Sequence, residues 1–498
     1  MNTTWRGAGR GRLVIPPREP GWRPLPLSAR PETAAQRWPW ALLSVVAVLL
    51  VIVAPTPLNI IVPLAPIAIA VLLRRPQWAV YALAFSVPFQ SLRAFDVSGL
   101  QLTSTEGLIG LATIAWCAAA AARGRFATPG RLPWRTALLV FGAAMLISVS
   151  QASDVRLSLK ELLKWAEMFL TYTLVLGMAR SPRDVPRLFL LLVGAGVAEA
   201  AVGLAQIGIH GGGVFHAAGV LRAAGTFDQP NPFAGFLNMS LPLALAALLL
   251  GLPRYGLLAR WAALLSGVAV LISLSRGAWL AILCAATLMA WLALPQRRQL
   301  INLGLITLLF IVVASAVGIL PSGVANAAAG MFGVSQVDVI NPTPVTWSTA
   351  ERLAHWLAGL GMFASHPFLG VGIGNYASAY KQFQVADVWS LPLGHAHNYY
   401  INIAAEAGVV GLGAYLFFLA ATFGLCARLW RTATTPWPRT VALGALGVMV
   451  TVAVQGFFDN VFVHGMEVQI ALVLALVALA ERHGARVDAA MATAKDGP

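Results

Sequence analysis

Residues 399–427 read YYINIAAEAGVVGLGAYLFFLAATFGLCA, an apolar run long enough to cross a bilayer as a helix. Directly before it stands Gly394-His395-Ala396-His397-Asn398, which places two of the chain's 8 histidines at the edge of a hydrophobic segment. Ionisable groups are costly to desolvate near a bilayer and are therefore scarce there. Because histidine titrates near neutral pH, this pair is a candidate for proton transfer.

The whole chain has the composition of a membrane protein. Hydrophobic residues make up 58% of its 498 residues and charged residues 11%, whereas soluble domains carry about 25% charged residues. The net charge of +15 does not indicate a nucleic-acid partner, because the arginines lie in short loops between apolar runs, as is typical of membrane proteins. Composition therefore predicts an all-α, polytopic integral membrane protein.

Apolar runs of about 20 residues, some of them shorter, define fourteen candidate spans. These are 39–54, 58–73, 77–92, 105–122, 134–150, 158–179, 186–209, 231–251, 256–274, 277–294, 299–320, 399–427, 439–458 and 464–481. The second and third are short and contain proline, so we expect about 12–14 transmembrane helices. A large loop, 321–394, separates the eleventh span from the twelfth, and we expect it to contain short helices.

The loop charges predict which side of the membrane each loop faces. With the N-terminus in the cytoplasm, the inner loops hold sixteen arginines and one acid, Asp184, whereas the outer segments hold eight basic residues and most of the acids. Cytoplasmic loops are enriched in Lys and Arg. An even number of spans then returns the C-terminus to the cytoplasm. Seven of the 8 histidines and the 321–394 loop fall on the outer face, where we expect no ATP or nucleotide sugars.

Three segments are predicted along the chain. Residues 1–37 contain seven arginines, several prolines and no apolar core, which indicates a disordered basic cytoplasmic tail near anionic membrane lipids. Residues 38–481 form the transmembrane domain, which includes the extracytoplasmic loop 321–394. Residues 482–498 form a cytoplasmic C-terminal tail.

The histidine segment is part of a longer pattern. His397-Asn398 is followed by nine residues and then by Gly408-Val409-Val410-Gly411. This resembles the signature of the O-antigen ligase family: His, then Asn, Ser or Gln, nine residues, Gly, two residues, and Gly, Thr or Tyr. The spacing places His397 at the start of a helix whose glycines allow close helix packing. A neutral His397 could accept a proton from a hydroxyl, with His395 in support. The alternative is a His–Asn helix cap beside an aromatic residue of the membrane interface.

Two further segments resemble the O-antigen ligases and polymerases. Leu274-Ser275-Arg276-Gly277 is a predicted tight turn between two spans on the outer side, and Arg222-Ala223-Ala224-Gly225 precedes the span that begins near Asn231. The planar guanidinium of arginine suits phosphate oxygens, and a helix N-terminus near Asn231 favours anions. The alternatives are that Arg276 reaches to lipid headgroups and that Asn231 caps a structured loop.

The 321–394 loop adds a third arginine. Arg352 lies in Glu351–Trp356, a candidate amphipathic helix, at a place where the family often has arginine. The resemblance therefore makes Arg352 a third phosphate ligand. The glycines of His366–Tyr376 imitate a phosphate loop, but no strand precedes them. We interpret the loop as a lid over the site.

Four other polar residues remain as candidates. Asn398, Asp459 and His464 could line the cavity, although Asp459 and His464 could equally be ordinary interface residues. Glu199 lies in mid-span, where a charge needs a partner or a proton, and we expect it to make a packing hydrogen bond. No Asp-x-Asp motif and no zinc-type Cys/His spacing occur, so we predict neither a metal nor a cofactor.

The resemblance covers about residues 200–460 and implies a glycosyltransferase of the bacterial inner membrane. Such enzymes transfer a glycan from undecaprenyl diphosphate to an acceptor hydroxyl on the periplasmic side. His397 would be the general base, and Arg276, Arg222 and Arg352 would neutralise the departing diphosphate without a metal. Direct displacement would invert the anomeric carbon.

The acceptor separates three alternatives within the superfamily. A ligase uses lipid A-core, a polymerase uses another glycan, and a protein O-oligosaccharyltransferase uses a Ser or Thr side chain. The fit to the ligase signature favours the ligase. A transporter of lipid-linked glycans, a different class of protein, would need charged residues along a path through the membrane, whereas here the ionisable residues cluster outside it.

Overall fold

The computed structural model describes residues 77–90, 94–97, 100–122, 132–210, 215–217, 220–227, 229–252, 255–306, 337–343 and 346–492. All of them lie in one of the two units into which the chain divides, Ala70–Pro498. The predicted tail 1–37, the first two candidate spans and most of the span 299–320 lie outside the described residues.

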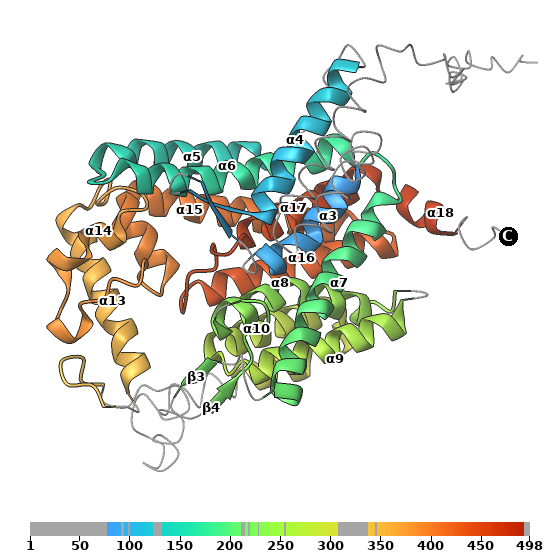
Figure 1. The fold of residues 1–498 in the computed structure, drawn as a ribbon. Coiled ribbons are helices and arrows are strands. Elements are labelled where there is room, and N and C mark those ends of the chain that lie inside the picture. Colours follow the sequence, from blue (N-terminus) through green and yellow to red (C-terminus); the bar gives the residue numbers. More distant parts are fainter. Residues whose placement is uncertain are drawn as a thin grey trace, which may run out of the picture. The chain divides into compact units, whose positions relative to one another are not determined.

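Helices make up most of the described chain (Figure 1). They are α3 (Gln77–Phe89), α4 (Ser104–Ala122), α5 (Arg135–Ser148), α6 (Val155–Met178), α7 (Asp184–Ala205), α8 (Pro230–Leu249), α9 (Gly256–Ile272), α10 (Arg276–Ala293), α13 (Trp347–Ser365), α14 (Tyr376–Phe383), α15 (Tyr399–Thr432), α16 (Pro436–Gln455), α17 (Met466–His483) and α18 (Arg486–Ala492). Two antiparallel hairpins, which the sequence did not predict, pair β1 (Ala94–Val97) with β2 (Leu100–Thr103) and β3 (Phe215–Ala217) with β4 (Val220–Arg222).

The predicted all-α, polytopic architecture is confirmed. Each candidate span that falls within the described residues coincides with a helix, from 77–92 with α3 to 464–481 with α17. By length and composition, α7, α8, α10, α15 and α16 can each cross a membrane, and α5 and α9 are shorter apolar helices. The large loop contains α13 and α14, as expected, although α13 has 19 residues and is not short.

The interior of the bundle is formed mainly by α8, α16 and α17, which are buried over most of their length. Every residue of α17 from Met466 to Ala480 is buried, and α17 packs against α6 and α16. Helices α8, α10 and α16 also pack against one another. Helices α5, α9 and α15 instead expose large apolar side chains such as Leu139, Trp261 and Phe417. Exposed apolar faces of this kind are suited to contact with lipid.

Helix α15 is broken at the first glycine of the family signature. Gly408 has φ 63° and ψ −163°, which only glycine adopts readily, so α15 consists of two helical parts on either side of this residue. A Cβ atom at Gly408 would overlap the backbone of Phe368, and one at Gly411 would overlap the side chain of Ala407. The interpretation that these glycines serve helix–helix packing is therefore wrong for Gly408, which allows a loop to approach a broken helix.

That loop is the glycine-rich segment 366–376. Its backbone bonds to both sides of the break: Val409 N donates to Pro367 O (2.8 Å), and Val371 N donates to the carbonyl oxygen of Ala405 (2.9 Å). The glycine at position 370 has φ 66° and lies against the backbone of Glu406. Gly370 therefore fits the loop against α15, whereas Gly372 and Gly374 lie against Ala152 and Leu157, so the segment does not form an open phosphate loop. The segment fixes the N-terminal part of α15, which follows the histidines.

Candidate active site

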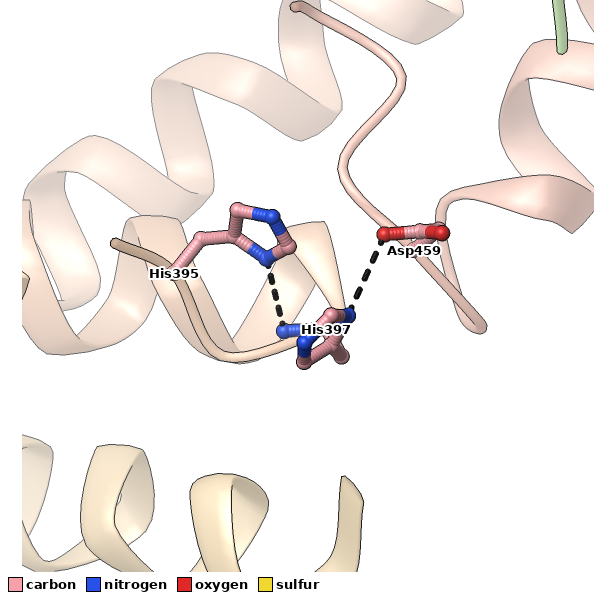
Figure 2. A group of neighbouring side chains, drawn as sticks. All are labelled: His395, His397 and Asp459. Atoms are coloured by element: carbon pink, nitrogen blue, oxygen red, sulfur yellow. Dashed lines mark hydrogen bonds and ion pairs between the residues drawn. The ribbon is translucent and has the colours of Figure 1, made fainter. Parts of the chain in front are cut away.

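His397 and Asp459 form the central pair of the site. Figure 2 shows His395 and His397 on the segment that leads into α15, and Asp459 on the turn that follows α16. His397 Nδ1 lies 3.3 Å from Asp459 Oδ1, and both side chains are largely buried. A neutral His397 that donates its Nδ1 hydrogen to Asp459 keeps the Nε2 lone pair available. Nε2 is buried, and among the described residues it has no hydrogen-bond partner.

The backbone of His397 is held in a turn that His395 stabilises. His397 has φ 52°, in the left-handed region that few non-glycine residues adopt. Its amide donates to His395 Nδ1 (3.1 Å), which must therefore lack a proton. Burial, followed by the charge of His397, lowers the pKa of His395 to about 4. His395 is thus neutral at physiological pH and acts as an acceptor for the backbone amide of His397.

Asp459 is held in its ionised form. Burial raises the pKa of Asp459, but the hydrogen bond from His397 and the charges of both histidines and of Arg352 outweigh it and lower the pKa well below its usual range. The turn that carries Asp459 is fixed by Lys164 of α6, whose Nζ donates to Phe462 O (3.0 Å). Lys164 also pairs with Glu161 (2.5 Å). An ionised Asp459 accepts a hydrogen bond from His397 Nδ1 and fixes the orientation of its ring.

His355 of α13 lies beside His397, and the sequence analysis did not single it out. Its side chain is buried, stacks on Tyr380 with ring centroids 4.7 Å apart, and lies 5.7 Å from the ring of His397. Burial and the charges of His397 and His395 lower the pKa of His355 to about 4. The signal was its spacing from Arg352, since residues three apart on a helix lie on one face.

Arg222 and the turn before Arg276 are joined, although 51 residues separate the bonded groups. Arg222 Nε donates to Ser273 O (2.8 Å), and its Nη2 donates to Asn231 Oδ1 in the first turn of α8 (3.3 Å). The backbone amide of Ala223 also donates to Ile272 O at the end of α9. The two segments that resembled the family separately therefore form one structure, in which Asn231 orients Arg222.

Arg276 is the first residue of α10, as the predicted turn requires. The backbone before it is constrained, because Leu274 has φ 52°. A Cβ atom at Gly277 would overlap Phe458, the neighbour of Asp459, so this glycine lets the start of α10 approach the Asp459 turn. A cation at a helix N-terminus is electrostatically unfavourable, since the helix dipole is positive there. An anion bound at this position would relieve both charges.

Arg352 links the arginines to the histidines. Burial lowers the pKa of Arg222, and the charges of Arg352 and Arg276 lower it further. The charge of Arg352 also affects the pKa of His395 and of Asp459. Arg222, Arg276 and Arg352, which we call the site arginines, thus repel one another within one region. Among the described residues, neither Arg276 nor Arg352 forms an ion pair with a carboxylate.

The other polar residues have supporting positions. Asn398 is buried and caps α15, with its Oδ1 accepting from the amides of Tyr400 and Ile401, so it is a helix cap and not a cavity-lining residue. His464 packs edge-on against Phe227, with ring centroids 5.9 Å apart. Glu199 accepts from the amide (2.7 Å) and the hydroxyl (2.9 Å) of Thr226, and so it holds the Arg222 segment rather than a neighbouring helix.

His395, His397 and Asp459, which we call the histidine group, also have the composition of a metal site. His395, His397 and Asp459 each offer one ligand atom, and these atoms lie within 4.8 Å of one another. Two histidines and a carboxylate suit zinc and related divalent metals. The nearby charges of Arg352 and Lys164 oppose a bound cation. The predicted metal independence therefore stays a prediction, and it can be tested directly.

Comparison with protein families adds an independent observation. Residues 261–416 match the family profile described as O-antigen ligase. The chain carries an O-antigen ligase domain. This match supports the predicted O-antigen ligase superfamily, and with the membrane-crossing helices it supports a multi-pass membrane glycosyltransferase of the ligase and polymerase type. A comparison with curated proteins found no match.

The matched region does not contain the whole site. It includes Arg276, Arg352 and His397, but Arg222 precedes it and Asp459 follows it. The structure brings these two residues to the O-antigen ligase domain through the bonds to Ser273 and His397. The site is therefore formed by segments both inside and outside the recognised domain.

Proposed function

We propose that the protein transfers a glycan from undecaprenyl diphosphate to the hydroxyl of an acceptor on the periplasmic face of the bacterial inner membrane. The observation that carries the proposal is the His397–Asp459 pair, whose buried Nε2 atom has no hydrogen-bond partner among the described residues, beside three mutually repelling arginines. A base and a concentration of positive charge are the two requirements for displacing a diphosphate with a hydroxyl.

The proposed reaction assigns each group one task. His397 Nε2 takes the proton of the acceptor hydroxyl, and Asp459 stabilises the imidazolium that forms. The hydroxyl oxygen forms a bond with the anomeric carbon as the bond from that carbon to the diphosphate oxygen breaks. The electron pair leaves with the diphosphate, whose charge the site arginines neutralise. Attack from the face opposite the leaving group inverts the anomeric carbon, and no metal takes part.

The test is transfer by the purified full-length protein from a lipid-linked glycan. We expect His397→Ala to lower the release of undecaprenyl diphosphate by about 10²- to 10⁴-fold, the usual contribution of a general base. His366→Ala, at an exposed histidine of the 321–394 loop, is the matched control and should retain activity. Full release by His397→Ala would overturn the assignment. Movement of the glycan lipid across liposome bilayers without any release would favour a transporter.

The proposed acceptor is lipid A-core, because the His397–Gly411 pattern fits the ligase signature. Competition decides this point: the protein is given lipid A-core, a second lipid-linked glycan and a Ser/Thr-containing peptide together. Preferential labelling of lipid A-core supports the ligase, whereas products of increasing glycan length or a labelled peptide would indicate a polymerase or a protein O-oligosaccharyltransferase.

A further inference from the structure

A second group of arginines surrounds a cavity at the other end of α15. The cavity has a volume of about 790 Å³ and lies among the start of α5, the C-terminal part of α15 and the end of α17. His397 precedes the N-terminus of the 34-residue α15, whereas Arg428 lies in its last turns, so the two sites are at opposite ends of this helix. The cavity is lined by Leu132, Pro133, Arg135, Arg428, Ala478, Glu481 and Arg482.

The cavity has an excess of positive charge. Three of its lining residues are arginines (Arg135, Arg428 and Arg482, the cavity arginines), and one is an acid. Arg428 Nε donates to Glu481 (3.0 Å), which offsets one of the three charges. Arg482 Nη1 donates to the carbonyl oxygen of Leu176, a bond that fixes its guanidinium. Arg135 is the first residue of α5, where the helix dipole is positive, so a bound anion would stabilise it.

An apolar surface continues from the cavity along the outside of the bundle. Leu139 and Leu146 follow Arg135 at helical spacing on the same face of α5, and they are 57% and 63% exposed. On α15, Phe417 is 46% exposed and lies three turns before Arg428 on a similar face. Charge at one end and exposed apolar side chains below it match the two parts of a phospholipid. A soluble anion would use only the first part.

We propose that the cavity arginines bind the phosphate of an anionic phospholipid, with the acyl chains along the exposed faces of α5 and α15. The loop charges predict that this end of the bundle faces the cytoplasm, where anionic headgroups attract clustered arginines. The site is separate from the histidine group, so it does not depend on the proposed transfer reaction. The lipid occupies a fixed place on the bundle instead of contacting it only in passing.

The experiment measures lipid binding to the full-length protein by native mass spectrometry from detergent. Phosphatidylglycerol is titrated against wild type and Arg135→Gln/Arg482→Gln, with phosphatidylcholine and soluble glycerol 3-phosphate as the other two ligands. Arg431→Gln is the matched control, since Arg431 lies at the same end of α15 but does not line the cavity. We expect the double variant to bind phosphatidylglycerol about 25-fold more weakly, at about fivefold for each arginine, and Arg431→Gln to bind as wild type.

Each of the other outcomes either supports or overturns the proposed lipid site. Equal binding by the double variant and wild type overturns the proposal, as does equal binding of phosphatidylcholine and phosphatidylglycerol. Binding of glycerol 3-phosphate as tight as that of phosphatidylglycerol overturns the lipid as the ligand. If the double variant fails to fold, Arg135→Gln alone should weaken phosphatidylglycerol binding about fivefold. Arg135 is exposed on a helix end, so this substitution leaves the interior unchanged.

Discussion

The site arginines and the cavity arginines are both clusters of three positive charges, but the surrounding chain is built differently. The site arginines come from a hairpin, the start of α10 and α13, near left-handed residues such as Leu274 and His397 and near the buried His355. The cavity arginines lie at the ends of helices, and one of them is paired with Glu481. Backbone strain and desolvated titratable groups gather where chemistry occurs. The difference therefore supports a role in the proposed transfer for the site arginines and a role in the proposed lipid binding for the cavity arginines.

Replacing Arg276 tests the first group most strongly. Arg276→Lys keeps the charge but loses the planar pair of donors, so we expect transfer to fall by about 100-fold if the diphosphate is bound in a bidentate manner. The measurement is the initial rate of undecaprenyl diphosphate release from the lipid-linked glycan. Arg431→Lys, at the other end of the molecule, should leave this rate unchanged. Full activity of Arg276→Lys would remove the distinction between the two groups.

Asp459→Asn is expected to have the next largest effect. The amide keeps the shape of Asp459 but cannot stabilise a protonated His397, so kcat should fall by about 10- to 100-fold with little change in KM for the donor. The measurement is the rate of undecaprenyl diphosphate release as a function of donor concentration, expressed per amount of folded protein. A structural role alone would lower the amount of folded protein without lowering kcat per folded molecule. An unchanged kcat would thus contradict the proposed pair.

Sequence patterns predicted the helices well and the site in part. Apolar runs located the described spans because burial in a bilayer requires about 20 apolar residues, a signal that is local in sequence. The motifs that contain Arg222, Arg276 and His397 were also local, and each was recognised separately. The hydrogen bond from Arg222 to Ser273 and the pair of His397 with Asp459 were not predictable, because they join residues 51 and 62 positions apart.

Gly408, the first glycine of the family signature, shows a different limit of prediction from sequence. Its spacing from His397 was visible, but its purpose was not, since a glycine in an apolar run is compatible with close packing of helices and equally with a break. The break at Gly408 depends on the loop 366–376, which contacts it through backbone atoms. Lys164 was missed for the same reason, because Phe462, which accepts its hydrogen bond, lies 298 positions away in the sequence.

Gly408→Ala tests whether the strained backbone at Gly408 is needed in α15, the helix that follows His397. Alanine at φ 63° and ψ −163° is strained, and its Cβ would overlap Phe368, so we expect a loss of stability of about 3 kcal/mol or more. The measurement is the midpoint of thermal unfolding in detergent. The matched control is Gly413→Ala on the same helix, where a Cβ meets nothing within 4 Å. Equal midpoints for the two variants would show that the break is not required.

Acid should destabilise the folded protein through the buried His355. The pKa of His355 is about 4 in the folded protein and 6.5 without burial, so the unfolded chain binds more protons between these values. Stability is then complete above about pH 6.5 and is lost as the pH falls toward 4, by about 3 kcal/mol for this residue. The midpoint temperature of thermal unfolding should therefore be lower at pH 5 than at pH 7. His355→Phe should reduce this drop, and an unchanged drop would exclude His355 as its source.

The smallest expected effect is that of a chelator, and it decides whether His397 acts as a base or as a metal ligand. If the site arginines neutralise the diphosphate, EDTA should change the rate of transfer by less than about twofold, because no bound cation is needed. His395, His397 and Asp459 nevertheless present ligand atoms within 4.8 Å of one another, an arrangement that could hold zinc. A loss of activity in EDTA that added Zn²⁺ restores would turn His397 from a base into a ligand. The same treatment should leave phosphatidylglycerol binding at the cavity arginines unchanged, since that site is formed by guanidinium groups, which do not coordinate metals.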